Sequence, residues 1–298
     1  MSELLSFSKY QGLGNDFVLV DGRQAELGLE AAEVRRICER RLGVGADGIL
    51  ELRRPEDPAA LVQMVVHNAD GSVAENCGNG LRCVVRHLVR TGEAPPEGEI
   101  VIETGAGPVR ARLEGEEVEV EMGAARSDAA SLQLTGPLGE SPDDDPDEPL
   151  LQVSLKLKDR KVEGTGVSLG NPHLVLFDAS REQAEALGQE ISTHERFAAG
   201  VNAGFAHLAA DGGIDLTVWE RGAGLTLACG TGACAAVAAA VATRRRPSGR
   251  WIEVRLPGGP LKVKAAEDLS QIWMRGPAVH VFDGRLERVA PADGEDEA

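Results

Sequence analysis

The stretch "LACGTGACAAVAAAVATRR", from Leu227 to Arg245, places a cysteine between small residues directly before an alanine-rich segment. A second stretch, "ENCGNGLRCVVRHLVR", from Glu75 to Arg90, has the same order of cysteine, glycine, one other residue and glycine before a helix-like run. A cysteine that only fills a core needs no glycines beside it, whereas glycine allows close approach to the backbone. The repetition therefore predicts that Cys77 and Cys229 are functional.

Other segments repeat in the same order and at nearly the same spacing. The segment "GNDFVLVD", starting at Gly14, matches "GNPHLVLFD", starting at Gly170, and "VVHNADG" matches "TVWERGA". "GVGADG" and "GVNAGF" form a weaker pair. An ordered series of such pairs indicates an internal repeat of one structural unit. We therefore expect two similar lobes with approximate twofold symmetry, in which Cys77 faces Cys229 across a cleft.

Short alternating segments, typical of strands, outnumber the helical ones. We expect helices at 31–41, 81–91, 181–190 and 233–245. The last is apolar on almost every face, which indicates burial on all sides. The sequence predicts an α+β fold of two pseudo-symmetric lobes, each a strand-rich sheet or open barrel wrapped around a central helix. The N-terminal lobe would span 1–125 and the C-terminal lobe 126–275, with the border near "EMGAARSDAA".

The composition argues against several classes of partner. The 298 residues include 31 basic and 48 acidic side chains, a net charge of -17, which disfavours nucleic acid and anionic membranes. The start "MSELLSFSKY" does not resemble a signal peptide, and no apolar run has membrane-spanning length. A cytoplasmic protein is therefore expected. The acidic run around 141–149 and the acidic tail at 289–298 are predicted to be solvated and disordered.

The cysteine and lysine content favours chemistry without a metal or cofactor. Five cysteines, an odd number without a secretory signal, indicate free thiols, and no CxxC pair suggests a zinc site. The six lysines lie mostly in alternating strand patterns, with no glycine-rich phosphate loop beside them. A lysine Schiff base with pyridoxal phosphate is therefore disfavoured.

Two cysteines at helix starts suit the inversion of a stereocentre. The amides at a helix start can hold a carboxylate, and the same field is expected to lower the pKa of a nearby thiol. If the two sites face each other, one thiolate removes a proton from one face of a carbon while one thiol delivers a proton to the other. Cys38, Cys83 and Cys234 are better explained as packing residues.

Three further residues, at two places in the sequence, have a structural interpretation, and two of them also have a functional one. Glu220 and Arg221, in "VWERGAG", form either a surface pair or a clamp for an amino-acid head, because arginine binds a carboxylate and glutamate accepts from an ammonium group. His173, in "GNPHLVLF", is on its own most readily explained as a core or capping residue.

The sequence resembles the diaminopimelate epimerase family. The resemblance is carried by "KYQGLGNDFVLVD", "GVGADGIL", "NADGSVAENCGNGLRC", "GNPH", "HERF", "VNAGF", "ERGAG" and "ACGTGACAA", in the order of the family, and "LPGG" and "GPAVHVFDG" extend it nearly to the end. It implies that Cys77 and Cys229 are the acid/base pair and that His173 and Glu220 assist catalysis. It also implies that backbone amides hold the reacting carboxylate, at Gly78, Asn79, Gly230 and Thr231. The implied substrate contacts are Asn15, Asn68, Asn171, Asn202, Glu220 and Arg221.

The same resemblance implies further features of the fold and assembly. A final strand at about 276–288 is expected to return to the N-terminal lobe. A homodimer is expected, with Phe282 at the contact between subunits. One position departs from the pattern: Gly48 stands where some relatives have a glutamine that contacts substrate, so this contact is absent or comes from the backbone.

We therefore expect cofactor-independent epimerisation of LL-2,6-diaminopimelate to the meso form, in lysine and peptidoglycan-precursor synthesis. Asn68, Asn202 and Arg221 would bind the distal, unreacting head. One alternative is a racemase of another amino acid, such as proline or histidine, on the same scaffold. Another is a non-catalytic amino-acid-binding or thiol redox protein, in which Cys77 and Cys229 form a regulatory disulfide.

Overall fold

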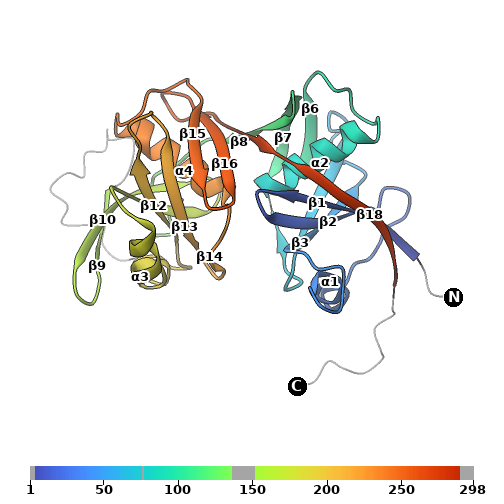
Figure 1. The fold of residues 1–298 in the computed structure, drawn as a ribbon, viewed down its shortest axis with the longest axis horizontal. Coiled ribbons are helices and arrows are strands. Elements are labelled where there is room, and N and C mark those ends of the chain that lie inside the picture. Colours follow the sequence, from blue (N-terminus) through green and yellow to red (C-terminus); the bar gives the residue numbers. More distant parts are fainter. Residues whose placement is uncertain (1–3, 76, 136–151, 289–298) are drawn as a thin grey trace. The chain divides into compact units, whose positions relative to one another are not determined.

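The computed structural model of the chain describes residues 4–75, 77–135 and 152–288. The chain forms two compact units: unit 1 comprises Met1–Val120 and Pro277–Ala298, and unit 2 comprises Glu121–Gly276. In each unit, strands surround a long helix (Figure 1). The acidic run at 141–149 and the acidic tail at 289–298 lie outside the described residues.

Unit 1 is rich in strands and has one short and one long helix. Its strands are β1 (Leu4–Gly12), β2 (Asn15–Asp21), β3 (Gly48–Arg53), β4 (Val62–Asn68), β5 (Val73–Ala74), β6 (Ile100–Thr104), β7 (Gly107–Glu114), β8 (Glu117–Gly123), which continues into unit 2, and β18 (Val279–Glu287). Its helices are α1 (Ala31–Cys38) and α2 (Gly78–Arg90).

Unit 2 has the same kinds of element in the same order. Its strands are β9 (Gln152–Lys156), β10 (Lys161–Ser168), β11 (Pro172–Phe177), β12 (Asn202–Leu208), β13 (Ile214–Glu220), β14 (Gly224–Leu225), β15 (Ile252–Leu256), β16 (Gly259–Ala265) and β17 (Ile272–Pro277). Its helices are α3 (Arg181–Ser192) and α4 (Gly230–Ala242).

The strand pairing of the two units is the same. In unit 1 the neighbours run β18-β1-β2-β3-β4-β6-β7-β8, with β5 paired to β4. In unit 2 they run β9-β10-β11-β12-β13-β15-β16-β17, with β14 paired to β13. The parallel pairs also correspond, β2/β3 and β4/β6 in unit 1 with β11/β12 and β13/β15 in unit 2. The predicted α+β fold of two pseudo-symmetric, strand-rich lobes is confirmed.

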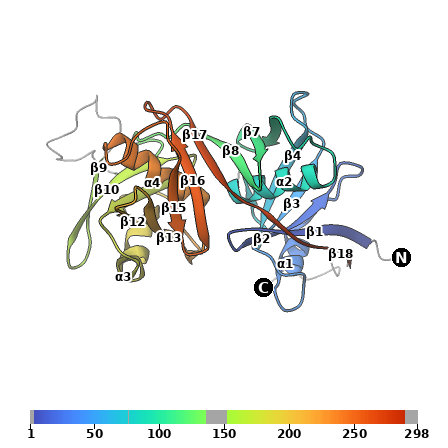
Figure 2. The same ribbon diagram turned by 45° about the horizontal axis from the view of Figure 1, so that its top comes forward.

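The last strand of the chain completes the first unit. β18 lies antiparallel along β1, from Leu4 opposite Glu287 to Gln11 opposite Val279 (Figures 1 and 2). It takes the place in unit 1 that β9 takes in unit 2, where β9 lies antiparallel to β10. The edge of unit 1 is therefore built from residues at opposite ends of the sequence.

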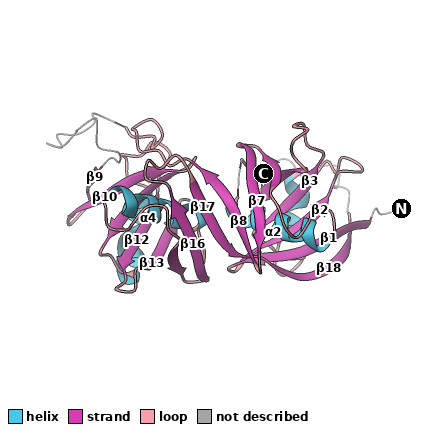
Figure 3. Cartoon of the chain, turned by 90° about the horizontal axis from the view of Figure 1, so that it is seen from above, coloured by secondary structure: helices cyan, strands magenta, loops and turns pink. Residues whose placement is uncertain are grey.

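The long helix of each unit packs against strands on several sides (Figure 3). α2 contacts β1, β2, β4, β7 and β18, and α4 contacts β10 to β13, β15 and β16. From Ala233 to Val241 every residue of α4 is buried, so the predicted burial on all sides is confirmed. Alanine suits this position because its small side chain lets strands approach from every direction.

Both long helices begin three residues earlier than we expect from the sequence. The expected starts are Leu81 and Ala233, whereas α2 begins at Gly78 and α4 at Gly230. Because glycine has a low helix propensity, a helix is expected to begin after the Cys-Gly-x-Gly motif rather than within it. Each helix is nevertheless capped by the preceding cysteine, which places the two cysteines directly at the helix starts. No helix in the described part of the chain is long and apolar enough to cross a membrane.

Candidate functional site

The residues that the sequence singled out lie at corresponding strand ends in the two units. In unit 1, Phe17 on β2 pairs with Gly48 at the start of β3, and Gly48 pairs with Asn68 at the end of β4. We call the set Asn15, Gly48, Asn68, Cys77, Gly78 and Asn79 half-site 1. The register is repeated in unit 2, where His173 on β11 pairs with Asn202 at the start of β12, and β13 ends at Glu220. We call the set Asn171, His173, Asn202, Glu220, Arg221, Cys229, Gly230 and Thr231 half-site 2.

Cys77 and Cys229 are each the N-terminal cap of a helix. Cys77 and Cys229 have extended backbone conformations, and their sulfur atoms accept hydrogen bonds from the amides of Gly80 and Gly232, both at 3.4 Å. A sulfur atom thus takes the position that a serine or aspartate oxygen commonly occupies at a helix start. The cap holds each sulfur at the positive end of a helix.

The second glycine of each motif makes room for this cap. A Cβ atom on Gly80 would lie 2.8 Å from the Leu50 side chain. On Gly232 it would lie 2.9 Å from the Val218 side chain and 3.2 Å from the sulfur of Cys229. These distances are shorter than ordinary contacts, so a larger residue would require Leu50 or Val218 to shift. Packing around the cap therefore accounts for the second glycine of each Cys-Gly-x-Gly motif.

The helix starts also offer amides to an anion. The first intrahelical hydrogen bonds run from Leu81 to the carbonyl of Cys77 and from Ala233 to that of Cys229. The two amides after each cysteine precede these bonds and belong to the positive end of the helix, where carboxylates bind well. These are the amides of Gly78, Asn79, Gly230 and Thr231. Each half-site therefore combines a sulfur atom with donors suited to one carboxylate.

The Cys229 thiol is held in its protonated form. Burial raises its pKa well above the ordinary value, and the nearby carboxylate of Glu220 raises it further, against hydrogen bonds from Thr231 and Gly232 that lower it. The expectation that the helix start lowers the pKa of this thiol is therefore wrong for Cys229. The loss of hydration outweighs the helix field. Thr226, which the sequence analysis did not identify, donates to Glu220 Oε1 at 2.5 Å and holds the carboxylate in place.

A chain of hydrogen bonds links His173 to the sulfur of Cys229. His173 Nε2 lies 3.1 Å from Asn171 Oδ1, Asn171 Nδ2 donates to Thr231 Oγ1 at 3.4 Å, and Thr231 Oγ1 lies 3.6 Å from the sulfur. His173 is fully enclosed, and burial, with the charge of Arg221, lowers its pKa to about 3. It is therefore neutral near pH 7 and acts as a hydrogen-bonding group rather than as a cation.

Arg221 is oriented by the backbone and by Asn202. The Arg221 amide donates to Asn202 Oδ1 at 3.0 Å, and Asn202 Nδ2 donates to the carbonyl of Pro172 at 3.1 Å. The guanidinium donates from Nη1 to the carbonyl of Ala199 at 3.0 Å. Arg221 as a whole is exposed to solvent. Asn202 is buried, so in this structure it ties the end of β13 to the start of β11.

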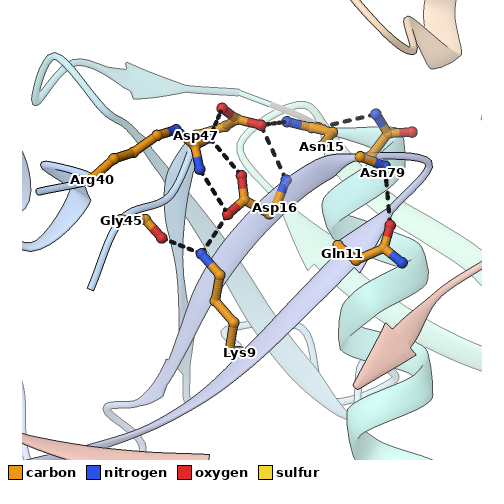
Figure 4. Close-up of polar contacts among 9 residues, drawn as sticks. Lys9, Gln11, Asn15, Asp16, Arg40, Gly45, Asp47 and Asn79 are labelled. Carbon is orange, nitrogen blue, oxygen red and sulfur yellow. Dashed lines mark hydrogen bonds and ion pairs between the residues drawn. The ribbon is translucent and has the colours of Figure 1, made fainter. Parts of the chain in front are cut away.

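In half-site 1 the amide of Asn15 is held between two neighbours (Figure 4). Its Nδ2 donates to Asp47 Oδ2 at 2.8 Å, and its Oδ1 accepts from Asn79 Nδ2 at 3.0 Å. Asn68 is exposed at the end of β4 and donates to Ser72 Oγ at 2.9 Å. Asp47 was not among the site residues expected from the sequence, although it lies within the repeated segment "GVGADG".

Gly48 occupies the position in unit 1 that Asn202 occupies in unit 2. A Cβ atom at Gly48 would lie 2.6 Å from the carbonyl oxygen of His67, which is closer than real contacts allow. Backbone packing between β3 and β4 therefore accounts for the glycine in this chain. A side-chain contact from this position is absent, as the departure from the family pattern suggested.

The remaining cysteines and Phe282 lie outside the two half-sites. Cys38, Cys83 and Cys234 are buried, as expected for packing residues, and none of the five cysteines forms a disulfide bond. Phe282 on β18 is 45% exposed and packs edge-on against Phe7 at 5.9 Å between ring centroids. Within the described residues no three His, Cys, Asp or Glu side chains are grouped so as to hold a metal ion.

The pKa of Cys229 should respond to the charge of Glu220. Replacing Glu220 with glutamine removes the negative charge that disfavours the thiolate, so the pKa of Cys229 should fall, while burial keeps it above the ordinary value. At a fixed alkaline pH the variant would thus have more thiolate than the wild type. The titration can be followed by NMR of cysteine labelled with carbon-13 at Cβ.

Two controls accompany this titration. Glu185→Gln removes a carboxylate on the surface of α3 that pairs with Arg181, and it should leave Cys229 unchanged. Cys83, whose pKa is raised by burial to about 12, should keep its signal in both variants and would report unfolding. Equal midpoints for Cys229 in the wild type and in Glu220→Gln would contradict the proposed electrostatic contact.

Comparison of the sequence with known proteins shows its family. The family model described as diaminopimelate epimerase matches residues 7–127 and 165–281. The diaminopimelate epimerase of Synechococcus sp. (strain JA-2-3B'a(2-13)) is 42% identical over 292 residues, covering 95% of this chain and 99% of the relative. That of Gluconobacter oxydans (strain 621H) is 42% identical over 281 residues, covering 94% and 98%.

Solved structures with the same fold are more distant in sequence. A probable proline racemase from Agrobacterium radiobacter K84 superposes with a TM-score of 0.68 at 17% identity, covering 98% of this chain and 94% of the other. A hydroxyproline epimerase from Agrobacterium vitis superposes with a TM-score of 0.67 at 15% identity, covering 98% and 95%. These likenesses show the fold alone, whereas the family model and the relatives of higher identity show the family. The chain belongs to the diaminopimelate epimerase family.

Proposed function

We propose that this protein is an isomerase that interconverts LL-2,6-diaminopimelate and meso-2,6-diaminopimelate, without pyridoxal phosphate or metal, in lysine and peptidoglycan-precursor synthesis. The observation that carries the proposal is the occurrence, once in each unit, of a cysteine sulfur that caps a helix beside the amides of its first turn. Family membership and relatives named diaminopimelate epimerase support the choice of substrate.

The two sulfur atoms would act as a proton acceptor and a proton donor. Because burial and Glu220 keep Cys229 protonated, Cys229 begins a cycle as the donor, and Cys77 begins it as the base. Cys77 removes the α-proton from one face, and Cys229 delivers a proton to the opposite face. The roles are exchanged for the reverse reaction, since the donor is left as a thiolate and the base as a thiol.

The difficult step is the removal of a weakly acidic α-proton. As the proton leaves, negative charge moves onto the carboxylate of the reacting centre. The amides of Gly78, Asn79, Gly230 and Thr231 would stabilise this charge, because they are fixed donors at the positive ends of two helices. No reorganisation of these donors is needed when the charge develops.

The other polar residues would select and orient the substrate. Asn15 and Asn171 would contact the reacting end, and Asn68, Asn202 and Arg221 the distal carboxylate. Glu220 would accept a hydrogen bond from an ammonium group as well as tune Cys229. Neutral His173 would assist by orienting Asn171 and Thr231, and through them the sulfur of Cys229.

We also propose a cytoplasmic homodimer. A reducing compartment suits a mechanism that needs both thiols free. For the dimer, the support is an exposed apolar row on β18, formed by Val279, Val281 and Phe282. Among the described strands β18 lies antiparallel to β1, and an exposed strand at the edge of a sheet can accept a second subunit.

A racemase of another amino acid is the main alternative. The acid/base chemistry would be unchanged, and the solved structures of similar fold include a hydroxyproline epimerase. The guanidinium of Arg221 favours diaminopimelate, because a substrate with a second carboxylate has a use for a cation at the distal end.

Replacing either reactive cysteine with serine should abolish most of the activity and preserve the fold. Serine is a good helix cap, so α2 and α4 should form normally, but an alcohol is a far poorer base near neutral pH. We expect kcat/KM to fall by roughly 10²- to 10⁴-fold in Cys77→Ser and in Cys229→Ser. Conversion of LL-diaminopimelate is measured by chiral chromatography with reduced protein and no added cofactor.

Cys38→Ala is the matched control for this measurement. Cys38 is a buried free thiol at the end of α1, so its removal should cost some stability and leave turnover nearly normal. Near-normal turnover in either serine variant would rule out the two-thiol mechanism. An inactive wild type would instead reject the substrate, and proline, hydroxyproline and histidine would be tried next.

The dimer makes a separate prediction. Phe282→Asp places a charge in the apolar row of β18 and should convert the dimer to a monomer in light scattering coupled to gel filtration. Leu42→Asp changes an exposed leucine outside this row and should leave the mass unchanged. A wild type that is monomeric at micromolar concentration, or a Phe282→Asp variant that stays dimeric, would contradict the proposed interface.

A further inference from the structure

A cluster of charged side chains, formed by Lys9, Asp16, Arg40 and Asp47, contacts half-site 1 through Asn15 (Figure 4). Asp47 Oδ1 accepts from Arg40 Nη2 at 2.7 Å, and the same Arg40 nitrogen donates to Asp16 Oδ1 at 2.7 Å. Lys9 Nζ pairs with Asp16 Oδ2 at 2.5 Å and donates to the carbonyl of Gly45. Lys9 and Asp16 are largely shielded from solvent. The cluster thus fixes the carboxylate of Asp47 from one side.

The backbone of Asp47 is fixed as well. Its amide donates to the carbonyl of Asp16 at 2.9 Å, and its carbonyl accepts from the amide of Ala69 at 3.1 Å. Its Oδ2 also accepts from the amide of Asp16 at 3.1 Å. Asp47 is therefore bonded to the turn that carries Asn15 and to the turn that follows Asn68.

The carboxylate of Asp47 determines which way the Asn15 amide points. An ionised carboxylate only accepts hydrogen bonds, so Asn15 must turn its NH₂ group toward Asp47 and its carbonyl toward Asn79. Asn79 must then turn its own NH₂ group toward Asn15. The result is a row of three groups, Asp47, Asn15 and Asn79, with a single direction of donation.

This direction is opposite to that of the equivalent residues in unit 2. Asn171 turns its carbonyl toward His173 and its NH₂ group toward Thr231, and the row ends at the sulfur of Cys229. In unit 1 the row ends at Asn79, whose side-chain carbonyl is buried without a hydrogen-bond partner. The backbone arrangement is the same in the two half-sites, but the side-chain amides of Asn15 and Asn171 point in opposite directions.

We propose that Asp47 is a positioning residue for substrate binding, because its carboxylate fixes the amides of Asn15 and Asn79 and gives half-site 1 a polarity opposite to that of half-site 2. The inference rests on the proposed function, in which Asn15 contacts the substrate. One N–H of the Asn15 amide donates to Asp47, and one lone pair of its carbonyl oxygen accepts from Asn79. The second N–H and the second lone pair, both in fixed directions, remain for the substrate.

Asp47→Asn tests the proposal with little change in shape. An amide at this position offers one oxygen in place of two, so it cannot accept from Arg40 and from Asn15 through separate oxygens. The Asn15 amide would lose its fixed direction. We expect KM for LL-diaminopimelate to rise on the order of tenfold, with kcat changing much less, because a binding group is misplaced and the sulfur atoms are not.

Asp21→Asn is the matched control. Asp21 lies at the other end of β2, is 43% exposed against 41% for Asp47, and likewise accepts from a guanidinium and a backbone amide, those of Arg23. It lies outside both half-sites. A merely structural role for Asp47 predicts similar losses of melting temperature in both variants and no selective rise in KM.

A second measurement does not depend on activity. The chain has six asparagines, so selective nitrogen-15 labelling gives six side-chain NH₂ signals. In Asp47→Asn the signals of Asn15 and Asn79 should shift, while that of Asn171 in unit 2 should not. In Asp21→Asn all three should stay in place. Assignment follows from single asparagine substitutions.

The outcomes separate the two proposals. A selective rise in KM together with shifted Asn15 and Asn79 signals supports the positioning role. Unchanged signals, or an unchanged KM in an active enzyme, would overturn it. If the wild type does not epimerise diaminopimelate, the proposed function fails, and the NMR signals alone decide whether Asp47 sets the direction of the Asn15 amide.

Discussion

The hydrogen bond from a helix amide to a cysteine sulfur is the interaction on which the rest of this structure depends. It places Cys77 and Cys229 at the positive ends of α2 and α4, beside amides that can hold a carboxylate. It also accounts for the second glycine of each motif, because a side chain on Gly80 or Gly232 would come too close to Leu50 or Val218. The second glycine of the motif and the position of the two sulfur atoms thus follow from one contact.

The two units share a topology but differ in what surrounds the sulfur. In unit 2 a buried thiol lies near the carboxylate of Glu220 and is kept protonated. In unit 1 the corresponding strand end carries Asn68 in place of a carboxylate. The nearby charged cluster contacts the site through the hydrogen bond between Asp47 and Asn15. A symmetric backbone therefore supports an asymmetric pair. Epimerisation in one direction needs such an asymmetry, since one group must begin as an acid and the other as a base.

Much of the fold could be predicted from the sequence. The repeat, the α+β class and the burial of the alanine-rich helix are confirmed, because periodicity and composition record them directly. The starts of α2 and α4 were misplaced, since the low helix propensity of glycine hides the sulfur cap. The family is confirmed by comparison, whereas the roles of the individual site residues remain predictions.

What the sequence could not reveal depends on tertiary contacts. The lowered pKa expected for Cys229 was wrong because the burial of that thiol and its proximity to Glu220 appear only after folding. In the sequence, Asp16 and Asp47 look like ordinary turn residues. Their ion pairs with Lys9 and Arg40 depend on the register of β1, β2 and β3. Although burial by itself raises the pKa of Asp16, its bonds to Arg40 and Lys9 outweigh burial and lower it.

The central claim is that two sulfur atoms, on opposite faces of the reacting carbon, exchange protons with it. The most direct measurement is the fate of deuterium when LL-diaminopimelate is converted in heavy water at low conversion. Two bases predict meso product with deuterium at the inverted α-carbon and recovered substrate without deuterium. Product that keeps the original hydrogen, or substrate that gains deuterium before any inversion, would point to a single base and contradict the account.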